Sequence, residues 1–136
     1  MKVKHVYQHD DTGCGLACVG MLVNKSYFEV KEKVLRSGLL KSNAEDFGTT
    51  FKQLIEILNQ FGVNTFPKRK FKKWSNIPAK VAIASTNYNS DGCWHWVVFV
   101  RDIDGYYIYD PSKPRKKIRD LRGKMSGWFI EISYLF

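Results

Sequence analysis

The stretch QHDDTGCGLACVGM, residues 8–21, decides the fold predicted for the first half of this chain. From Cys14 onward it is apolar along most of its length, which is typical of a buried helix. Gly13 and Gly15 flank Cys14, and glycine lets a backbone turn tightly and approach another molecule closely. The dipole and the unpaired N–H groups of a helix that begins at Cys14 would favour a thiolate there. The alternative, a small buried hydrophobe, is the interpretation kept for Cys18, one turn further along the same face.

Two capping-box patterns predict the next helices. Ser26 followed by Glu29 has the spacing in which each side chain bonds the other residue's backbone N–H, and a helix through Leu35 fits, with Gly38 as its stop. A second pattern, Thr50 with Gln53, opens the run FKQLIEILNQF, and Gly62 ends it. The apolar face predicted for this third helix consists of Phe51, Leu54, Ile55 and Leu58.

The second half of the chain predicts an antiparallel sheet. Strand candidates are residues 63–66, 81–85, 95–101, 106–109 and 128–134. Helices followed by strands indicate an α+β fold, with the helices packed on one side of the sheet. No repeat, low-complexity tract or linker divides the sequence, so we expect one domain over residues 1–136.

A late hairpin is predicted to bring a histidine and an aspartate together. His95 heads the run HWVVFV, and Asp110 closes the run YYIYDP. A hairpin loop centred on residues 103–104 places Asp110 opposite Val97, and hence diagonal to His95 on the same face. We therefore expect Asp110 to orient the imidazole of His95, as the third member of a triad does. The competing interpretations are a buried core histidine and a turn-forming aspartate before Pro111.

Composition restricts the partners and the compartment. The net charge of +9 is concentrated at residues 68–73 (KRKFKK) and 113–124 (KPRKKIRDLRGK). Such segments attract acidic partners, but they lack the stacking aromatics of a nucleic-acid reader, so a solvated face is favoured over nucleic acid. Three cysteines do not make a disulfide framework. With neither a signal peptide nor a membrane span in the sequence, we expect a cytoplasmic protein, or one delivered without a signal peptide.

A zinc centre is the rival chemistry for the same residues. Cys14, Cys18, Cys93 and His95 have the ligand types of a Cys₃His site. Structural zinc sites usually open with a close cysteine pair on a turn, whereas Cys14 and Cys18 would share a helix. We therefore expect neither a metal nor another cofactor.

Several motifs together resemble a known family, the double-glycine peptidases. These are the papain-like domains at the N-terminus of bacteriocin-processing ABC exporters. Gln8, six residues before Cys14, is similar to the family's oxyanion glutamine, and CGLAC is similar to its nucleophile motif. GTTFKQLIEILNQFG resembles its third helix, His95 in HWVVF and Asp110 in YDPS match its histidine and aspartate, and GWFIEIS resembles its last strand. The family usually carries Asp or Glu where this chain has Gly13. Because residues 1–136 hold no transmembrane or ATPase region, we expect a free-standing domain.

The resemblance implies a papain-like α+β fold and a cysteine peptidase that cleaves leader peptides after Gly-Gly. Cys14 would be the nucleophile, His95 the base, Asp110 its orienting group, and the Gln8 amide with the Cys14 N–H the oxyanion donors. The expected partners are a peptide or protein substrate and an exporter or immunity protein. Two alternatives stay open. One is a papain-like effector toxin with amidase, acyl-transfer or nuclease chemistry, and the other is a non-catalytic basic binding module.

Overall fold

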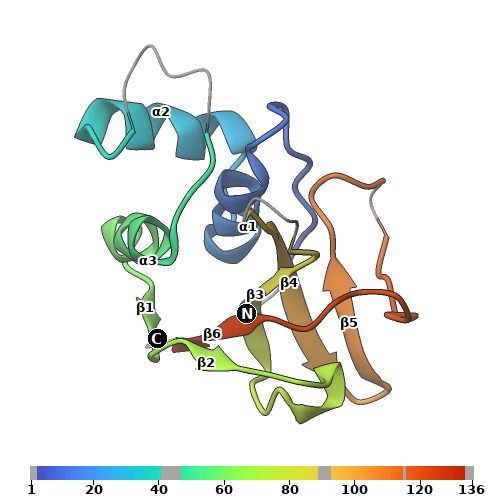
Figure 1. Cartoon of the computed structure of the whole chain (residues 1–136). Coiled ribbons are helices and arrows are strands. Elements are labelled where there is room, and N and C mark those ends of the chain that lie inside the picture. The colour runs from blue at the N-terminus through green and yellow to red at the C-terminus, as the bar shows by residue number, and fades with distance from the viewer. Residues whose placement is uncertain (1–2, 41–46, 89–92, 115, 134–136) are drawn as a thin grey trace.

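The structure, a computed structural model, describes residues 3–40, 47–88, 93–114 and 116–133 (Figure 1). Within these ranges three helices precede six strands. The helices are α1 (Cys14–Val23), α2 (Tyr27–Ser37) and α3 (Phe51–Gln60). The strands are β1 (Asn64–Thr65), β2 (Arg69–Lys70), β3 (Val81–Thr86), β4 (His95–Asp102), β5 (Gly105–Tyr109) and β6 (Trp128–Ser133), and a 3-10 turn, η1, spans Trp74–Asn76.

The predicted helix starts are confirmed by their caps. The Ser26 hydroxyl accepts from the Glu29 N–H while the Glu29 carboxylate accepts from the Ser26 N–H, so two backbone donors at the start of α2 are satisfied. Gly38 closes α2 in the left-handed region, at φ 80°. Thr50 and Gln53 make the same reciprocal pair at the start of α3.

The apolar face predicted for α3 left out one buried residue. Leu54 and Leu58 are fully buried as expected, and Ile57 is buried with them, while Phe51 and Ile55 are half-buried and pack against the same core. Because α3 packs against both α1 and β1, its contact face is turned toward the Ile57 side of the stripe. The spacing of apolar residues predicts the buried face of a helix to within about one position. The elements that pack against the helix decide which residues lie at the centre of that face.

The strands form an antiparallel sheet in the order β1-β6-β3-β4-β5, with β2 also paired to β6. In the β4–β5 hairpin Val98 pairs with Tyr109 and Asp102 with Gly105, so the loop is residues 103–104, as predicted. The short strand β2 was not predicted, since both of its residues are exposed and basic and only pairing with β6 makes them a strand. Tyr134, expected in the closing strand, lies outside the described residues.

Apolar clusters cover both faces of the sheet. On one face α1 packs directly on β4, and its residues Leu16, Ala17 and Cys18 are completely buried. On the other face Phe71, Trp74 and Ile77 cover the central strands. Figure 1 shows the three helices gathered at one side of the sheet. The segment that follows β5 leads back across the sheet to β6. The burial of Cys18 was predicted.

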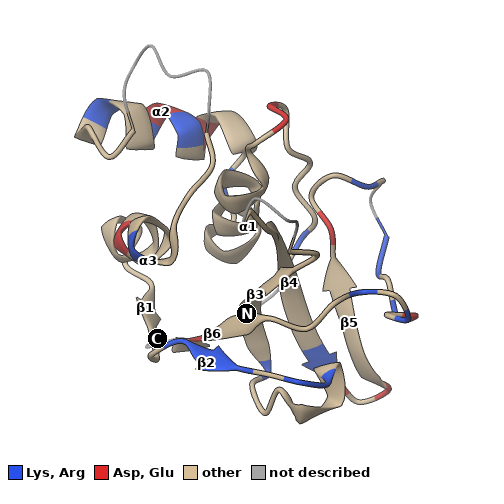
Figure 2. Ribbon diagram, in the orientation of Figure 1, with Lys and Arg blue, Asp and Glu red and all other residues tan. Residues whose placement is uncertain are grey.

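Basic side chains lie mostly on the sheet half of the molecule. Figure 2 shows lysine and arginine on β2 and along the chain that follows β5. Lys70, Lys72 and Lys73 are exposed, as are Lys113, Lys116 and Lys117. Among the described residues no helix is both long and apolar enough to cross a bilayer.

Candidate active site

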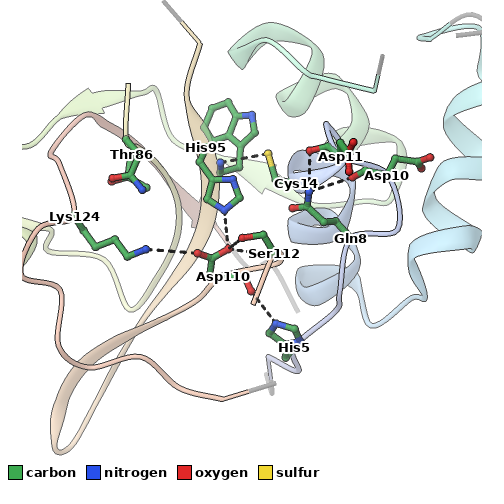
Figure 3. Close-up of polar contacts among 12 residues, drawn as sticks. His5, Gln8, Asp10, Asp11, Cys14, Thr86, His95, Asp110, Ser112 and Lys124 are labelled. Atoms are coloured by element: carbon green, nitrogen blue, oxygen red, sulfur yellow. Dashed lines mark hydrogen bonds and ion pairs between the residues drawn. The ribbon is translucent and has the colours of Figure 1, made fainter. Parts of the chain in front are cut away.

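Cys14 is the first residue of α1, and its sulfur faces the start of β4. Gly13 precedes it as the N-cap without a side-chain cap bond. The N–H groups of the first helical turn have no acceptor inside the helix, so they present positive charge around the cysteine. Cys14 is 8% exposed, and its Sγ accepts from the backbone N–H of Trp96 at 3.5 Å (Figure 3). The helical half and the sheet half of the chain therefore meet at this sulfur.

The two glycines beside Cys14 are required by packing. A Cβ on Gly13 would lie 2.0 Å from the Tyr27 hydroxyl oxygen, and one on Gly15 would lie 2.2 Å from Oγ1 of Thr49. The φ of Gly13 is −86°, which any residue adopts, so its turn does not demand glycine. The Tyr27 hydroxyl donates to the Asp10 carboxylate at 2.7 Å. The side chain of α2 thus occupies the space that a larger residue at position 13 would fill.

His95 and Asp110 are joined directly. Nε2 of His95 lies 2.7 Å from Oδ1 of Asp110, as the predicted hairpin register requires (Figure 3). This bond leaves Nδ1 of the ring for Cys14, and a hydrogen bond between the His95 and Cys14 side chains is among the interactions that set the histidine's charge. The three predicted residues Cys14, His95 and Asp110 are therefore brought into one chain of contacts.

Asp110 is held by more than the histidine. Its side chain is 2% exposed, and Oδ1 also accepts from the backbone N–H and the hydroxyl of Ser112, at 2.9 and 2.7 Å. Its backbone oxygen lies 2.9 Å from Nε2 of His5. The bond from the Ser112 N–H is the local turn that an aspartate before proline commonly makes. Asp110 thus forms a turn and orients a histidine with the same carboxylate.

The electrostatics of this pair favour an imidazolium beside a carboxylate. Burial opposes the charge of His95 and lowers its pKa, but hydrogen bonds and charge interactions with Asp110 and Cys14 outweigh burial and raise the pKa to about 9. Burial acts to raise the pKa of Asp110, yet the bonds from His95 and Ser112 hold it below its ordinary value. Histidine therefore stays protonated at neutral pH in this site, where it can both hold charge and donate a proton.

Gln8 lies beside the site, but its amide is already engaged. Its backbone N–H donates to the Pro111 carbonyl at 2.9 Å, which ties the segment before α1 to the loop after Asp110. Its Nε2 donates to the backbone oxygens of Asp10 and Asp11, at 3.1 and 3.0 Å (Figure 3). Its Oε1 is buried and accepts no hydrogen bond from the described part of the chain. Both amide hydrogens are thus directed at carbonyls of the loop that leads into α1.

A cleft of about 350 Å³ opens next to Cys14. Its walls come from the approach to α1, from residues 48–50 before α3, and from residues 93–96 at the start of β4. Trp94 and Trp96 both line it, and their rings pack edge to face at 5.7 Å. Cys93 is exposed at the same cleft. In the described ranges there is no group of three or more His, Cys, Asp or Glu residues arranged to hold a metal ion.

The protein was compared with solved structures and with curated proteins. The structure is similar to the crystal structure of the Pseudomonas avirulence protein AvrPphB, with a TM-score of 0.53 and 10% sequence identity, over 98% of this chain and 97% of that one. At this identity the similarity shows the fold alone, which is the papain-like cysteine peptidase fold. No curated protein matches the sequence significantly.

The family assignment follows from the sequence itself. The model of the peptidase C39 family matches residues 2–128, so this chain belongs to the peptidase C39 family. It is a cysteine peptidase, and its substrate is accordingly a peptide or a protein. The predicted fold class and the predicted enzyme class are both confirmed.

Sequence reasoning missed two polar residues at the site. Ser112 bonds Asp110 from two positions further along, which an Asp-Pro-Ser turn could have indicated. Lys124 places its ammonium 3.6 Å from Oδ2 of Asp110 and was treated only as part of a basic segment. No local signal distinguishes Lys124 from its neighbours, because its contact is fourteen residues away along the chain.

Proposed function

We propose that Cys14, His95 and Asp110 act as nucleophile, base and orienting group in peptide-bond hydrolysis. The observation that carries this proposal is the position of His95, which lies between the Cys14 sulfur and the buried Asp110 carboxylate. The sulfur sits at a helix N-terminus, where unpaired N–H groups present positive charge. The cleft beside it gives a substrate access to that sulfur.

In the proposed reaction the Cys14 thiolate attacks the carbonyl carbon, and the carbonyl electron pair moves to oxygen. The His95 imidazolium then gives its proton to the leaving nitrogen as the C–N bond breaks, which leaves a thioester on Cys14. Neutral His95 next takes a proton from water, whose oxygen attacks the thioester. The acid product departs, and the thiolate and imidazolium are restored. Asp110 keeps the imidazole in the tautomer and orientation that both transfers need.

The oxyanion donors that we propose are the Cys14 N–H and the Gln8 amide. The Cys14 N–H belongs to the free first turn of α1. For Gln8 to serve, one of its bonds to the Asp10 or Asp11 carbonyls is exchanged for the oxyanion when substrate binds. A negatively charged oxygen is the stronger acceptor, so this exchange is favourable in the transition state.

We further propose that the substrate is a leader peptide cut after Gly-Gly. Two tryptophans and Thr49 are among the residues that line the cleft beside Cys14. We infer that these side chains leave little room for a side chain next to the scissile bond. Glycine carries no side chain and fits such a channel. An exporter is the partner class that this substrate implies, whereas an immunity protein belongs to the effector-toxin alternative.

The test is incubation with synthetic leader peptides that end in Gly-Gly and continue for several residues, with matched Ala-Ala peptides as controls. Mass spectrometry should find cleavage after Gly-Gly by the wild type and none by Cys14→Ala. Equal cleavage of the Ala-Ala peptides would contradict the specificity. Failure to cut any peptide, while iodoacetamide still alkylates Cys14, would favour the effector-toxin alternative, for which the charge of +9 suits an acidic target.

A further inference from the structure

Lys124 faces the oxygen of Asp110 that the histidine does not use. Oδ1 of Asp110 receives His95 and both Ser112 donors, whereas Oδ2 lies 3.6 Å from the Lys124 ammonium (Figure 3). The Lys124 side chain is 21% exposed and the Asp110 side chain 2% exposed, so water screens this ion pair only partly. The carboxylate is thus shared between two cations on its two oxygens.

The backbone around Lys124 is held at several points, so the base of its side chain has a defined place beside Asp110. The Trp74 indole N–H donates to the Lys124 carbonyl at 3.2 Å, and the Lys124 N–H donates to the Leu121 carbonyl at 3.0 Å. The next carbonyl, that of Met125, accepts from the Thr86 hydroxyl at 2.5 Å. Thr86 is the β3 partner of His95 on β4. The strand pair that carries the histidine therefore also anchors the lysine segment.

We infer that Lys124 is a positioning residue of the site, and that its ammonium limits how strongly Asp110 holds the proton on His95. This inference rests on the proposed function, in which His95 must release its proton to the leaving nitrogen. The negative charge of Asp110 stabilises the imidazolium of His95. The positive charge of Lys124 on the other carboxylate oxygen offsets part of that negative potential, which lowers the pKa of His95. An acid that is held too strongly protonates a leaving group poorly.

The sign of the effect follows from the charges that face this pair. Cys14 and Cys18 approach from α1, His5 from the segment before it, and Lys124 from the segment before β6. Lys124 is the cation on the far side of Asp110. Because Oδ1 keeps its bonds from His95 and Ser112 when Lys124 is replaced, the carboxylate stays in place. Loss of the ammonium then leaves more negative potential at the imidazole, and the pKa of His95 rises.

The experiment compares the intact protein with Lys124→Met, Lys124→Gln and Lys124→Arg, and with Lys116→Met as a matched control from the same basic segment. Lys116 is exposed, so its removal changes the net charge equally without reaching the site. The pKa of His95 is read from ¹⁵N NMR of its ring, which needs no substrate. We expect the pKa to rise by about 0.5 or more in the Met and Gln variants and to stay unchanged in Lys124→Arg and Lys116→Met.

An unchanged His95 pKa in a folded Lys124→Met or Lys124→Gln protein overturns the inference, and so does a lowered one, because that would mean a displaced carboxylate. If Lys124→Met does not fold, Lys124→Gln keeps an uncharged polar chain at this partly exposed position. In an active enzyme the alkaline limb of kcat/KM should move upward with the His95 pKa. Because the NMR readout is independent of peptide cleavage, failure of the peptidase proposal would leave it interpretable.

Discussion

Asp110 combines two kinds of contact that usually belong to different residues. Its carboxylate closes the local turn to Ser112 and also orients His95, fifteen residues earlier. Both sets of donors favour the ionised carboxylate, so each supports the other. At 2% exposure an unpaired Asp110 would be costly, which makes the carboxylate and the imidazolium dependent on each other.

Replacing Asp110 with asparagine should lower the pKa of His95. The amide cannot supply the negative charge that holds the imidazolium, and only the contacts with Cys14 then oppose burial, so we expect the pKa to fall from about 9 toward the ordinary value of 6.5. Ring ¹⁵N NMR measures it directly, and peptide cleavage should drop by about 10²-fold or more. Ser112→Ala keeps the negative charge of Asp110 and is the control, in which we expect a smaller change in the pKa of His95. A His95 pKa that stays near 9 in Asp110→Asn would show that Asp110 is not what holds the proton.

At the scale of elements, the caps of α2 and α3 use the same chemistry in different places. Ser26 with Glu29 starts α2, and Thr50 with Gln53 starts α3. Each cap supplies acceptors for N–H groups that a helix start cannot satisfy by itself. The cap of α3 adjoins the cleft, since Thr50 is one of the lining residues, whereas Ser26 is not.

Ser26→Ala and Thr50→Ala should therefore cost similar stability but differ in activity. Each removes one capping acceptor, so we expect a loss of about 1 kcal/mol in the free energy of unfolding, measured by urea denaturation. Only Thr50→Ala loosens the wall of the cleft, so only it should raise KM. Equal KM values in the two variants would argue that the start of α3 does not shape substrate binding.

At the scale of the whole molecule, the site lies where the two halves of the chain meet. α1 supplies the sulfur, while β4 and the segment after β5 supply the histidine and the aspartate. Contacts between α1 and β4 hold these parts in register. Removal of a charge from the buried site should therefore lower the free energy of unfolding of the whole protein as well as alter the site.

We expect stability to fall in acid through Asp110. The pKa of Asp110 in the folded protein lies below its ordinary value of 3.8. Its ionised carboxylate therefore contributes to the free energy of unfolding above pH 3.8, and this contribution is lost as the pH falls through the lower pKa of the folded protein. The difference in unfolding free energy between wild type and Asp110→Asn should be largest at about pH 5–7 and should close toward about pH 2. Guanidinium denaturation at several pH values measures it.

Asp120→Asn is the matched control for this experiment. Asp120 pairs with Arg122 at 2.6 Å, but both side chains are exposed, so solvent screens the pair. Its pH profile should follow that of the wild type. A gap between wild type and Asp110→Asn that does not change with pH would contradict the role of the buried carboxylate.

The parts of the fold that sequence could predict are those set within a few residues. The helix starts at Ser26 and Thr50 depend on partners three residues away. The hairpin loop at residues 103–104 determines which residue of β4 pairs with which residue of β5. Because the loop sets this register, counting residues from it was enough to predict that Asp110 lies near His95. The two-residue strand β2 escaped prediction because its pairing with β6 lies nearly sixty residues away.

The sequence by itself determined the helices, the hairpin register and the identities of Cys14, His95 and Asp110, because caps, periodicity and loop length act over short distances. Only the tertiary structure decided that the Gln8 amide bonds two loop carbonyls, that Tyr27 fills the space beside Gly13, and that Lys124 reaches Asp110. The contacts of Tyr27 and Lys124 join residues fourteen positions apart, which meet only in the folded chain. The Gln8 amide bonds neighbouring carbonyls, but it does so in a loop whose backbone is tied to Pro111 across the molecule. Patterns that span only a few residues hold no information about such contacts.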